Sequence, residues 1–113
     1  MSPIVDVTAI LIANPGKIER VVDEFRKMEV YVKANEPQVL RYELRRGLPE
    51  KNNGVELVVI REIYANEEVQ RAHIATPQCQ AFMKAMEEEK LCSEVKVVVT
   101  KPGGPGLGFE ARL

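Results

Sequence analysis

His73 is the side chain best suited to acid–base chemistry, because it is the only histidine among the 113 residues. An imidazole titrates near neutral pH, so it can take a proton from a bound molecule or donate a hydrogen bond to an oxyanion. His73 lies four residues after Val69, which places the two side chains on one face of a helix. This spacing allows two interpretations: a core histidine whose nitrogens are satisfied by backbone groups, or a ring that projects into a pocket.

Five further side chains are candidates for contacts with a bound molecule. Tyr42 and Tyr64 fall in strand-like segments, where a phenol ring is usually buried but can also donate a hydrogen bond. Phe25, Phe82 and Met83 are expected in the core, although methionine also suits the wall of an adaptable cavity. The candidate catalytic residue is therefore His73, and the candidate substrate-binding residues are Tyr64, Tyr42, Phe25, Phe82 and Met83.

The sequence does not indicate a metal, nucleotide or flavin site. His73 has no thiol at ligand spacing beside it, so a structural zinc is not expected. The glycine-rich segment 103–106 leads into no predicted helix and lacks the context of a phosphate-binding loop. We therefore expect no metal and no organic cofactor. Cys79 and Cys92 are too far apart for a Cys-x-x-Cys motif, and the N-terminus lacks the features of a secretory signal, so both thiols are expected to be reduced.

The charge balance argues against two classes of partner. The chain has 17 acidic and 16 basic residues, interspersed along its length. This pattern offers no basic stripe for nucleic acid and no polybasic patch for a membrane surface. No run of eighteen apolar residues is present to span a bilayer. We expect one globular domain in the cytoplasm, with neither nucleic acid nor membrane as a partner.

The candidate site residues depend for their positions on the predicted strands and helices, of which the first helix has clear boundaries. Asn14 and Pro15 are typical of a helix N-cap and a first helical position, and Pro37 predicts that the helix ends near residue 34. Apolar residues spaced by three and four form one stripe of this helix: Ile18, Val21, Val22, Phe25, Met28 and Val32. Runs of β-branched and apolar residues predict four strands, at 5–13, 39–46, 55–64 and 94–101.

Two further helix-capping signals lie on either side of His73 in the sequence. Asn66 is expected to cap a short helix that carries His73, and Thr76 followed by Pro77 is expected to start another helix. Residues 1–101 are therefore expected to form a single domain. The remaining segment, 102–113, has four glycines and two prolines, and we expect it to run extended or to wrap a neighbour.

Three motifs follow one another between residues 36 and 82. They are Leu-Arg-Tyr-Glu at 40–43, a strand ending in Glu-Ile-Tyr at 62–64, and Ala-His-Ile-Ala-Thr-Pro at 72–77. The order resembles the antibiotic-biosynthesis monooxygenase (ABM) family of small dimeric α+β barrel proteins, and the layout agrees over nearly the whole chain. The resemblance implies a ferredoxin-like β-α-β-β-α-β fold, in which a four-stranded antiparallel sheet carries helices on one face and two copies form a barrel.

The resemblance also implies a chemistry. Some family members oxygenate phenols, anthrones or quinols without metal or organic cofactor, inside an apolar cavity that removes a proton from the substrate. His73 would then be the general base or oxyanion donor, and Tyr64 and Tyr42 would orient a small aromatic substrate. Other members degrade haem through an axial histidine. The corresponding position here is Met83, so haem degradation is disfavoured.

This chain departs from the family pattern at one motif. Where members often have Ser-Pro-His-Phe, residues 76–79 read Thr-Pro-Gln-Cys, so a second histidine is missing. Two alternatives to an oxygenase therefore stay open. One is a cyclase, decarboxylase or dehydratase that uses the same cavity without oxygen. The other is a non-catalytic binding or stress-response barrel, whose cavity would be filled by side chains.

The predicted strands are apolar on both faces. Val7 and Leu11 alternate with Ile10 and Ile12 along the first strand. Helices can cover only one face of a four-stranded sheet, and the apolar face left over would exceed what a monomer usually exposes. We therefore expect a homodimer packed through the sheet face with two-fold symmetry.

Overall fold

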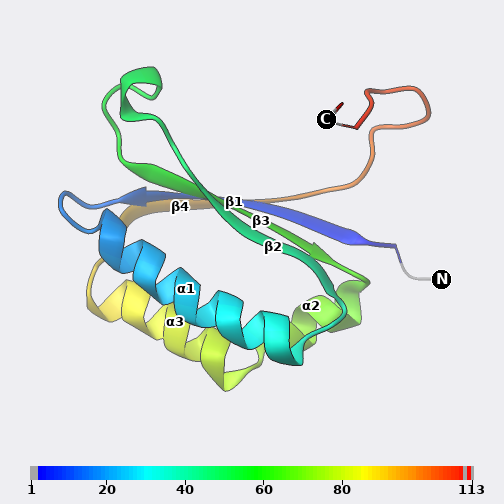
Figure 1. Ribbon diagram of the computed structural model, residues 1–113, viewed down its shortest axis with the longest axis horizontal. Coiled ribbons are helices and arrows are strands. Elements are labelled where there is room, and N and C mark those ends of the chain that lie inside the picture. Colours follow the sequence, from blue (N-terminus) through cyan, green and yellow to red (C-terminus); the bar gives the residue numbers. More distant parts are fainter. Residues whose placement is uncertain (1–2, 111, 113) are drawn as a thin grey trace.

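A four-stranded antiparallel sheet carries three α-helices on one face in the computed structural model, which describes residues 3–110 and 112 (Figure 1). The chain order β-α-β-β-α-α-β confirms the predicted ferredoxin-like α+β fold, with the second helical position split into two helices. The elements are β1 (Val5–Ala13), α1 (Ile18–Asn35), β2 (Val39–Arg46), β3 (Leu57–Tyr64), α2 (Glu67–Ile74), α3 (Pro77–Glu88) and β4 (Cys92–Thr100).

The strand and cap predictions agree closely with these bounds. β1 and β2 match residue for residue, whereas β3 begins two residues later than predicted and β4 runs from Cys92 to Thr100. The Asn66 side chain accepts a hydrogen bond from the backbone N–H of Val69, and Thr76 accepts one from Cys79, which confirms both predicted caps. These caps satisfy backbone donors that a helix start leaves unpaired.

The predicted start of the first helix is wrong. α1 begins at Ile18, not at Pro15, and no side chain caps it. The Asn14 amide instead donates to the carbonyl oxygen of Lys90 at 2.6 Å, and its backbone N–H donates to Leu91 at 2.9 Å. Contacts between distant segments therefore replace the local cap. Gly16, with a φ of 77°, makes the turn that leads into the helix.

Strand pairing decides which side chains face the helices. The sheet order is β2-β3-β1-β4, so β1 lies between β3 and β4. Val7 of β1 lies opposite Glu62 of β3, and Ala9 lies opposite Ile60. Because side chains alternate along a strand, Ile60, Glu62 and Tyr64 all point to the helical side.

The apolar stripe of α1 packs against this face, as predicted. Its buried members are Val21, Val22, Phe25, Met28 and Val32, while Ile18 is partly buried beside them. Leu91, just before β4, is fully buried in the same core. Burial of each such side chain contributes on the order of 1.5–3 kcal/mol to folding.

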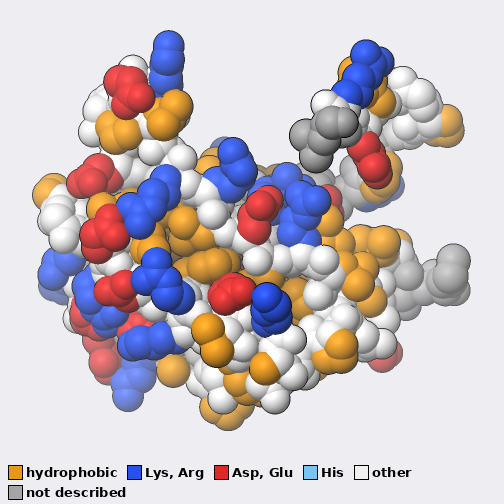
Figure 2. Space-filling model, in the orientation of Figure 1, with side chains coloured by type: hydrophobic (Ala, Val, Ile, Leu, Met, Phe, Trp, Pro, Cys, Tyr) orange, Lys and Arg blue, Asp and Glu red, His pale blue; other side chains and the backbone are white. Residues whose placement is uncertain are grey.

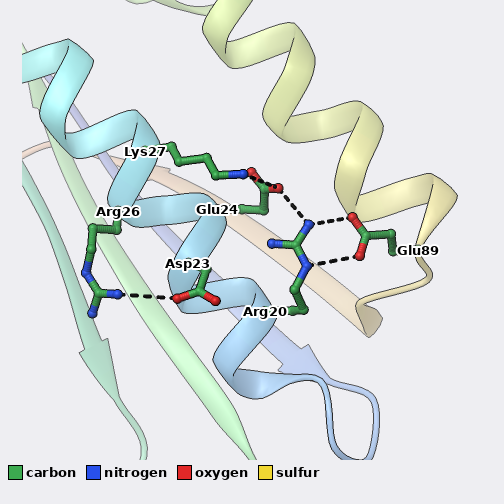
Figure 3. Close-up of polar contacts among 6 residues, drawn as sticks. All are labelled: Arg20, Asp23, Glu24, Arg26, Lys27 and Glu89. Atoms are coloured by element: carbon green, nitrogen blue, oxygen red, sulfur yellow. Dashed lines mark hydrogen bonds and ion pairs between the residues drawn. The ribbon is translucent and has the colours of Figure 1, made fainter.

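An ion-pair network joins α1 to the end of α3 (Figure 3). The Arg20 guanidinium donates to Glu24 at 2.7 Å and, through Nε, to Glu89 at 3.0 Å. The Lys27 ammonium approaches the same Glu24 oxygen at 3.2 Å. These hydrogen bonds lower the pKa of the Glu24 and Glu89 carboxyls. The network holds the two long helices side by side above the sheet.

The other face of the sheet carries no helix (Figure 1). The β2–β3 loop and the C-terminal segment both extend on that side (Figure 1). Charged side chains of both signs cover the region of α1, and further ones lie on the two protruding segments (Figure 2). Leu107 and Phe109 of the C-terminal segment are exposed, and the Arg112 guanidinium lies 4.2 Å from the Phe109 ring centroid. Residues 1–2 of the predicted domain, and 111 and 113 of the predicted tail, lie outside the described residues.

Over residues 3–110 and 112, none of the helices combines the length and hydropathy that crossing a bilayer requires.

Candidate functional site

A cavity of about 480 Å³ lies between the sheet and the helices α2 and α3. This volume is in the range of small-molecule sites in proteins. Most of its lining is apolar, so a hydrophobic ring would be favoured there over water. The sheet contributes the side chains of Val7, Ala9, Leu11, Tyr42, Ile60, Glu62, Tyr64, Val95 and Val97, and α3 contributes Cys79, Phe82, Met83 and Met86.

His73 reaches this cavity from the last turn of α2. Its residue is only 3% exposed, and its ring lines the cavity. The Thr76 hydroxyl donates to the carbonyl oxygen of His73 at 2.7 Å while it caps α3. The cap therefore fixes the backbone of His73 as well as the start of the next helix.

Both ring nitrogens of His73 face carboxylates. Nδ1 lies 2.9 Å from Oε1 of Glu36, the C-cap residue directly after α1. Nε2 lies 3.9 Å from Oε1 of Glu62, which is beyond hydrogen-bond distance. The ring is therefore held from one side and open toward the cavity on the other. The interpretation of His73 as a core histidine satisfied by backbone groups does not describe this geometry.

Glu62 is the acidic group of the cavity floor. Burial raises the pKa of its carboxyl, and the hydrogen bond that Tyr64 donates to Oε1 offsets part of that rise. Burial also raises the pKa of the Tyr64 phenol well above its usual range, with the Glu62 charge adding to the effect. Tyr64 is thus a neutral donor at physiological pH, and Glu62 is its acceptor.

Aromatic rings surround the imidazole. The Tyr42 ring meets it edge-on with 5.5 Å between centroids, and the Tyr64 ring lies tilted at 5.4 Å. Behind Tyr42, Phe25 stacks at 4.9 Å with an interplanar angle of 7°. Such pairs are worth about 0.5–1.5 kcal/mol beyond their buried area. The stack holds Tyr42 in place from the side away from the cavity.

The structure brings five of the six candidate residues to the cavity. Its lining includes His73, Tyr42, Tyr64, Phe82 and Met83. Met83 is 43% exposed and lies at the edge of the cavity. Phe25 is not part of the lining; it lies in the core behind Tyr42.

Sequence reasoning missed two carboxylates of the site. Glu62 was detectable, because alternation along β3 puts it on the face of Ile60 and Tyr64. Glu36 had no local signal, since 37 residues separate it from His73 and only the fold brings the two together.

The two cysteines also line the cavity, as free thiols. Burial raises the pKa of Cys79 to about 11, which disfavours the reactive thiolate. Within the described part of the chain, no cluster of three or more His, Cys, Asp or Glu side chains could hold a metal ion. None of the residues that line the cavity is Lys or Arg. The arrangement can therefore exchange a proton but offers no fixed cation for an anionic ligand.

Comparisons with known proteins agree with this geometry. The antibiotic biosynthesis monooxygenase family model matches residues 4–85. A candidate antibiotic biosynthesis monooxygenase from Caulobacter crescentus CB15 is similar, with 26% identity, a TM-score of 0.77, and coverage of 91% of this chain and 92% of that chain. No relative was found among curated proteins.

Two more distant structures share the fold. PA3566 from Pseudomonas aeruginosa has 22% identity and a TM-score of 0.75, over 92% of this chain and 98% of that chain. Rv0793 from Mycobacterium tuberculosis has 19% identity and a TM-score of 0.75, over 92% and 99% respectively. Because the family model covers most of the sequence and the fold agrees, the chain belongs to the antibiotic biosynthesis monooxygenase family.

Proposed function

We propose that this protein is a cofactor-independent monooxygenase that acts on a neutral phenolic aromatic, of the anthrone or quinol type, in cytoplasmic secondary metabolism. The observation that carries the proposal is the placement of His73, a buried imidazole that lines an apolar cavity and whose Nε2 lies 3.9 Å from the Glu62 carboxylate, beyond hydrogen-bond distance. Family membership supports the reaction class. The cavity is open rather than filled by Phe25, Phe82 and the methionines, which argues against a decayed site.

The substrate supplies all four electrons that reduce dioxygen, so the proposed reaction needs no other reductant. His73 takes a proton from the acidic CH₂ of an anthrone, and the electron-rich carbanion that remains reacts with dioxygen. A carbon–oxygen bond forms, and the second C–H bond of that carbon and the O–O bond then break. The departing oxygen takes up that second proton and the one that His73 returns. The CH₂ becomes a carbonyl, which is a four-electron oxidation, and the second oxygen atom leaves as water. The protein supplies the base, the dry cavity and the orientation of the ring.

The charges around the cavity favour an uncharged substrate. Glu62 and Glu87 line it, and no cationic side chain does. A substrate that carries a carboxylate or phosphate would lose its hydration without gaining a partner. The anion formed during the reaction has a partner, because proton transfer turns His73 into an imidazolium. Tyr42 would orient the substrate oxygen from the β2 side.

Oxygen uptake tests this function directly. The purified protein is mixed with a panel of anthrones and quinols in an oxygen electrode, alongside carboxylated analogues of the same rings. We expect one dioxygen consumed per anthrone converted, with the neutral rings turned over faster than the carboxylated ones. Equal conversion under anaerobic conditions would instead identify a cyclase, decarboxylase or dehydratase. Absence of conversion across the panel would favour a binding protein.

We also propose a homodimer that packs through the helix-free face of the sheet. That face presents Ile10, Ile12, Val59 and Ile63, and the β2–β3 loop and C-terminal segment flank it (Figure 1). Two copies facing each other there would form the barrel that the family resemblance implies.

Light scattering after size exclusion tests the assembly. The wild-type protein should have twice the mass of one chain. Val59→Lys should shift the mass to that of a monomer, because it buries an unpaired charge in the interface. The matched control, Val30→Lys, makes the same change at an exposed position of α1 and should leave the dimer intact. A monomeric wild-type protein would rule the proposal out.

A further inference from the structure

We propose that Glu36 is a positioning residue that holds His73 in the Nδ1–H tautomer and so leaves Nε2 as the proton acceptor facing the cavity. The tautomer assignment is drawn from the contact between Glu36 and Nδ1. Its consequence for catalysis rests on the proposed function.

The tautomer follows from what each group can donate. An ionised carboxylate has only acceptors, so the contact of 2.9 Å between Glu36 and Nδ1 requires the hydrogen on Nδ1. A neutral imidazole carries one such hydrogen, so Nε2 is left with its lone pair. The carboxylate nearest to Nε2, Glu62, is 3.9 Å away and accepts a hydrogen bond from Tyr64.

The backbone holds Glu36 firmly in this position. It is the C-cap residue of α1, and its N–H donates to the carbonyl oxygen of Val32 at 2.8 Å. Pro37 follows directly and restricts the conformation of the residue before it. The Glu36 side chain is only 14% exposed, so water competes weakly for its contact with the ring.

The rings and carboxylates around the imidazole are Tyr42 from β2 and Glu62 and Tyr64 from β3, and Cys79 of α3 lines the same cavity. Lys33 and Arg41 line a surface hollow together with Glu36, but among the described residues neither forms an ion pair with it. The second oxygen of Glu36, Oε2, is buried and has no hydrogen-bond partner among the described residues. When His73 takes a proton from the substrate, the Glu36 carboxylate is therefore the counter-charge beside the new imidazolium.

Nitrogen NMR of the untagged protein tests the tautomer without any substrate. Since His73 is the only histidine, one imidazole spin system reports the answer. Above neutral pH we expect a protonated Nδ1 and an unprotonated Nε2. Glu36→Leu keeps the bulk of the side chain but removes the acceptor, and it should shift the population toward Nε2–H. The control Glu68→Gln removes an exposed carboxylate from α2, the helix that carries His73, and should leave the spectrum unchanged.

Two results would overturn the assignment. One is a wild-type spectrum with the hydrogen on Nε2, which needs no variant and so does not depend on whether Glu36→Leu folds. The other is a folded Glu36→Leu protein with the wild-type tautomer. On an active substrate, Glu36→Leu should lower kcat on the order of 10²-fold with little change in KM, because Glu36 does not line the cavity. A confirmed tautomer in a protein without oxygenase activity would overturn only the proposed function.

Discussion

Replacing His73 with alanine should lower kcat for anthrone or quinol oxidation by roughly 10²–10⁴-fold, which is the usual contribution of a positioned general base. The reason is that in the proposed mechanism His73 is the proton acceptor on the α2 side of the cavity, while Glu62 already accepts a hydrogen bond from Tyr64. Initial rates of oxygen uptake at saturating substrate measure the effect. Added imidazole should restore part of the rate, since the vacated space connects to the cavity.

The matched control for this change is Arg71→Ala. Arg71 lies on the same helix with its side chain 63% exposed, so its removal should leave kcat unchanged. Thermal melting of both variants checks that each remains folded. A folded His73→Ala protein with wild-type kcat would remove the assigned role of the imidazole and the proposed mechanism with it.

Replacing Phe25 with alanine should lower the free energy of unfolding by about 3–5 kcal/mol, as for other buried phenylalanines. Phe25 lies on α1 with 6% of its surface exposed, in the core between that helix and the sheet, and its ring stacks on Tyr42. The change leaves a void in that core and removes the support behind Tyr42. Urea denaturation followed by circular dichroism measures the loss. Activity should fall as a secondary effect, because an unsupported Tyr42 no longer borders the cavity in one orientation.

Phe25→Leu separates support from substrate contact. Leucine keeps most of the buried volume, so a much smaller loss of stability than for alanine is expected. If Phe25 instead contacted the substrate, KM would rise in the leucine variant while the unfolding free energy changed little. That pattern would contradict the position of the ring behind Tyr42.

Local signals explain why most of the fold could be predicted. Asn66 and Thr76 act as caps through hydrogen bonds to residues three positions away, so the residues that matter are neighbours in the sequence. The stripe of α1 depends only on helical spacing, and the structure buries all of its predicted apolar members except the partly buried Ile18; the buried charged residue Glu24 lies outside that pattern. Asn14 shows the limit of such signals. It has the right chemistry for a cap, but contacts with residues more than seventy positions away hold it elsewhere.

The candidate site was predictable only in part, for the same reason. His73 could be chosen by its type and by its place on a helix. Its partner Glu36 could not, since the end of one helix has no sequence relation to the face of another. Glu62 is intermediate: alternation along its strand predicts which face of the sheet its side chain is on, but not that it lies near His73. The different surroundings of Nδ1 and Nε2 therefore follow from the folded structure and not from the sequence.

The exposed edge of the sheet determines how a ligand can enter. Val95 and Val97 point to the helical side and line the cavity, yet they are 56% and 59% exposed because the helices stop short of β4. The site is thus a slot with one long open side. For the proposed function, this opening along β4 is the route by which a planar ring would reach the imidazole, and a longer fused ring system would protrude past the strand.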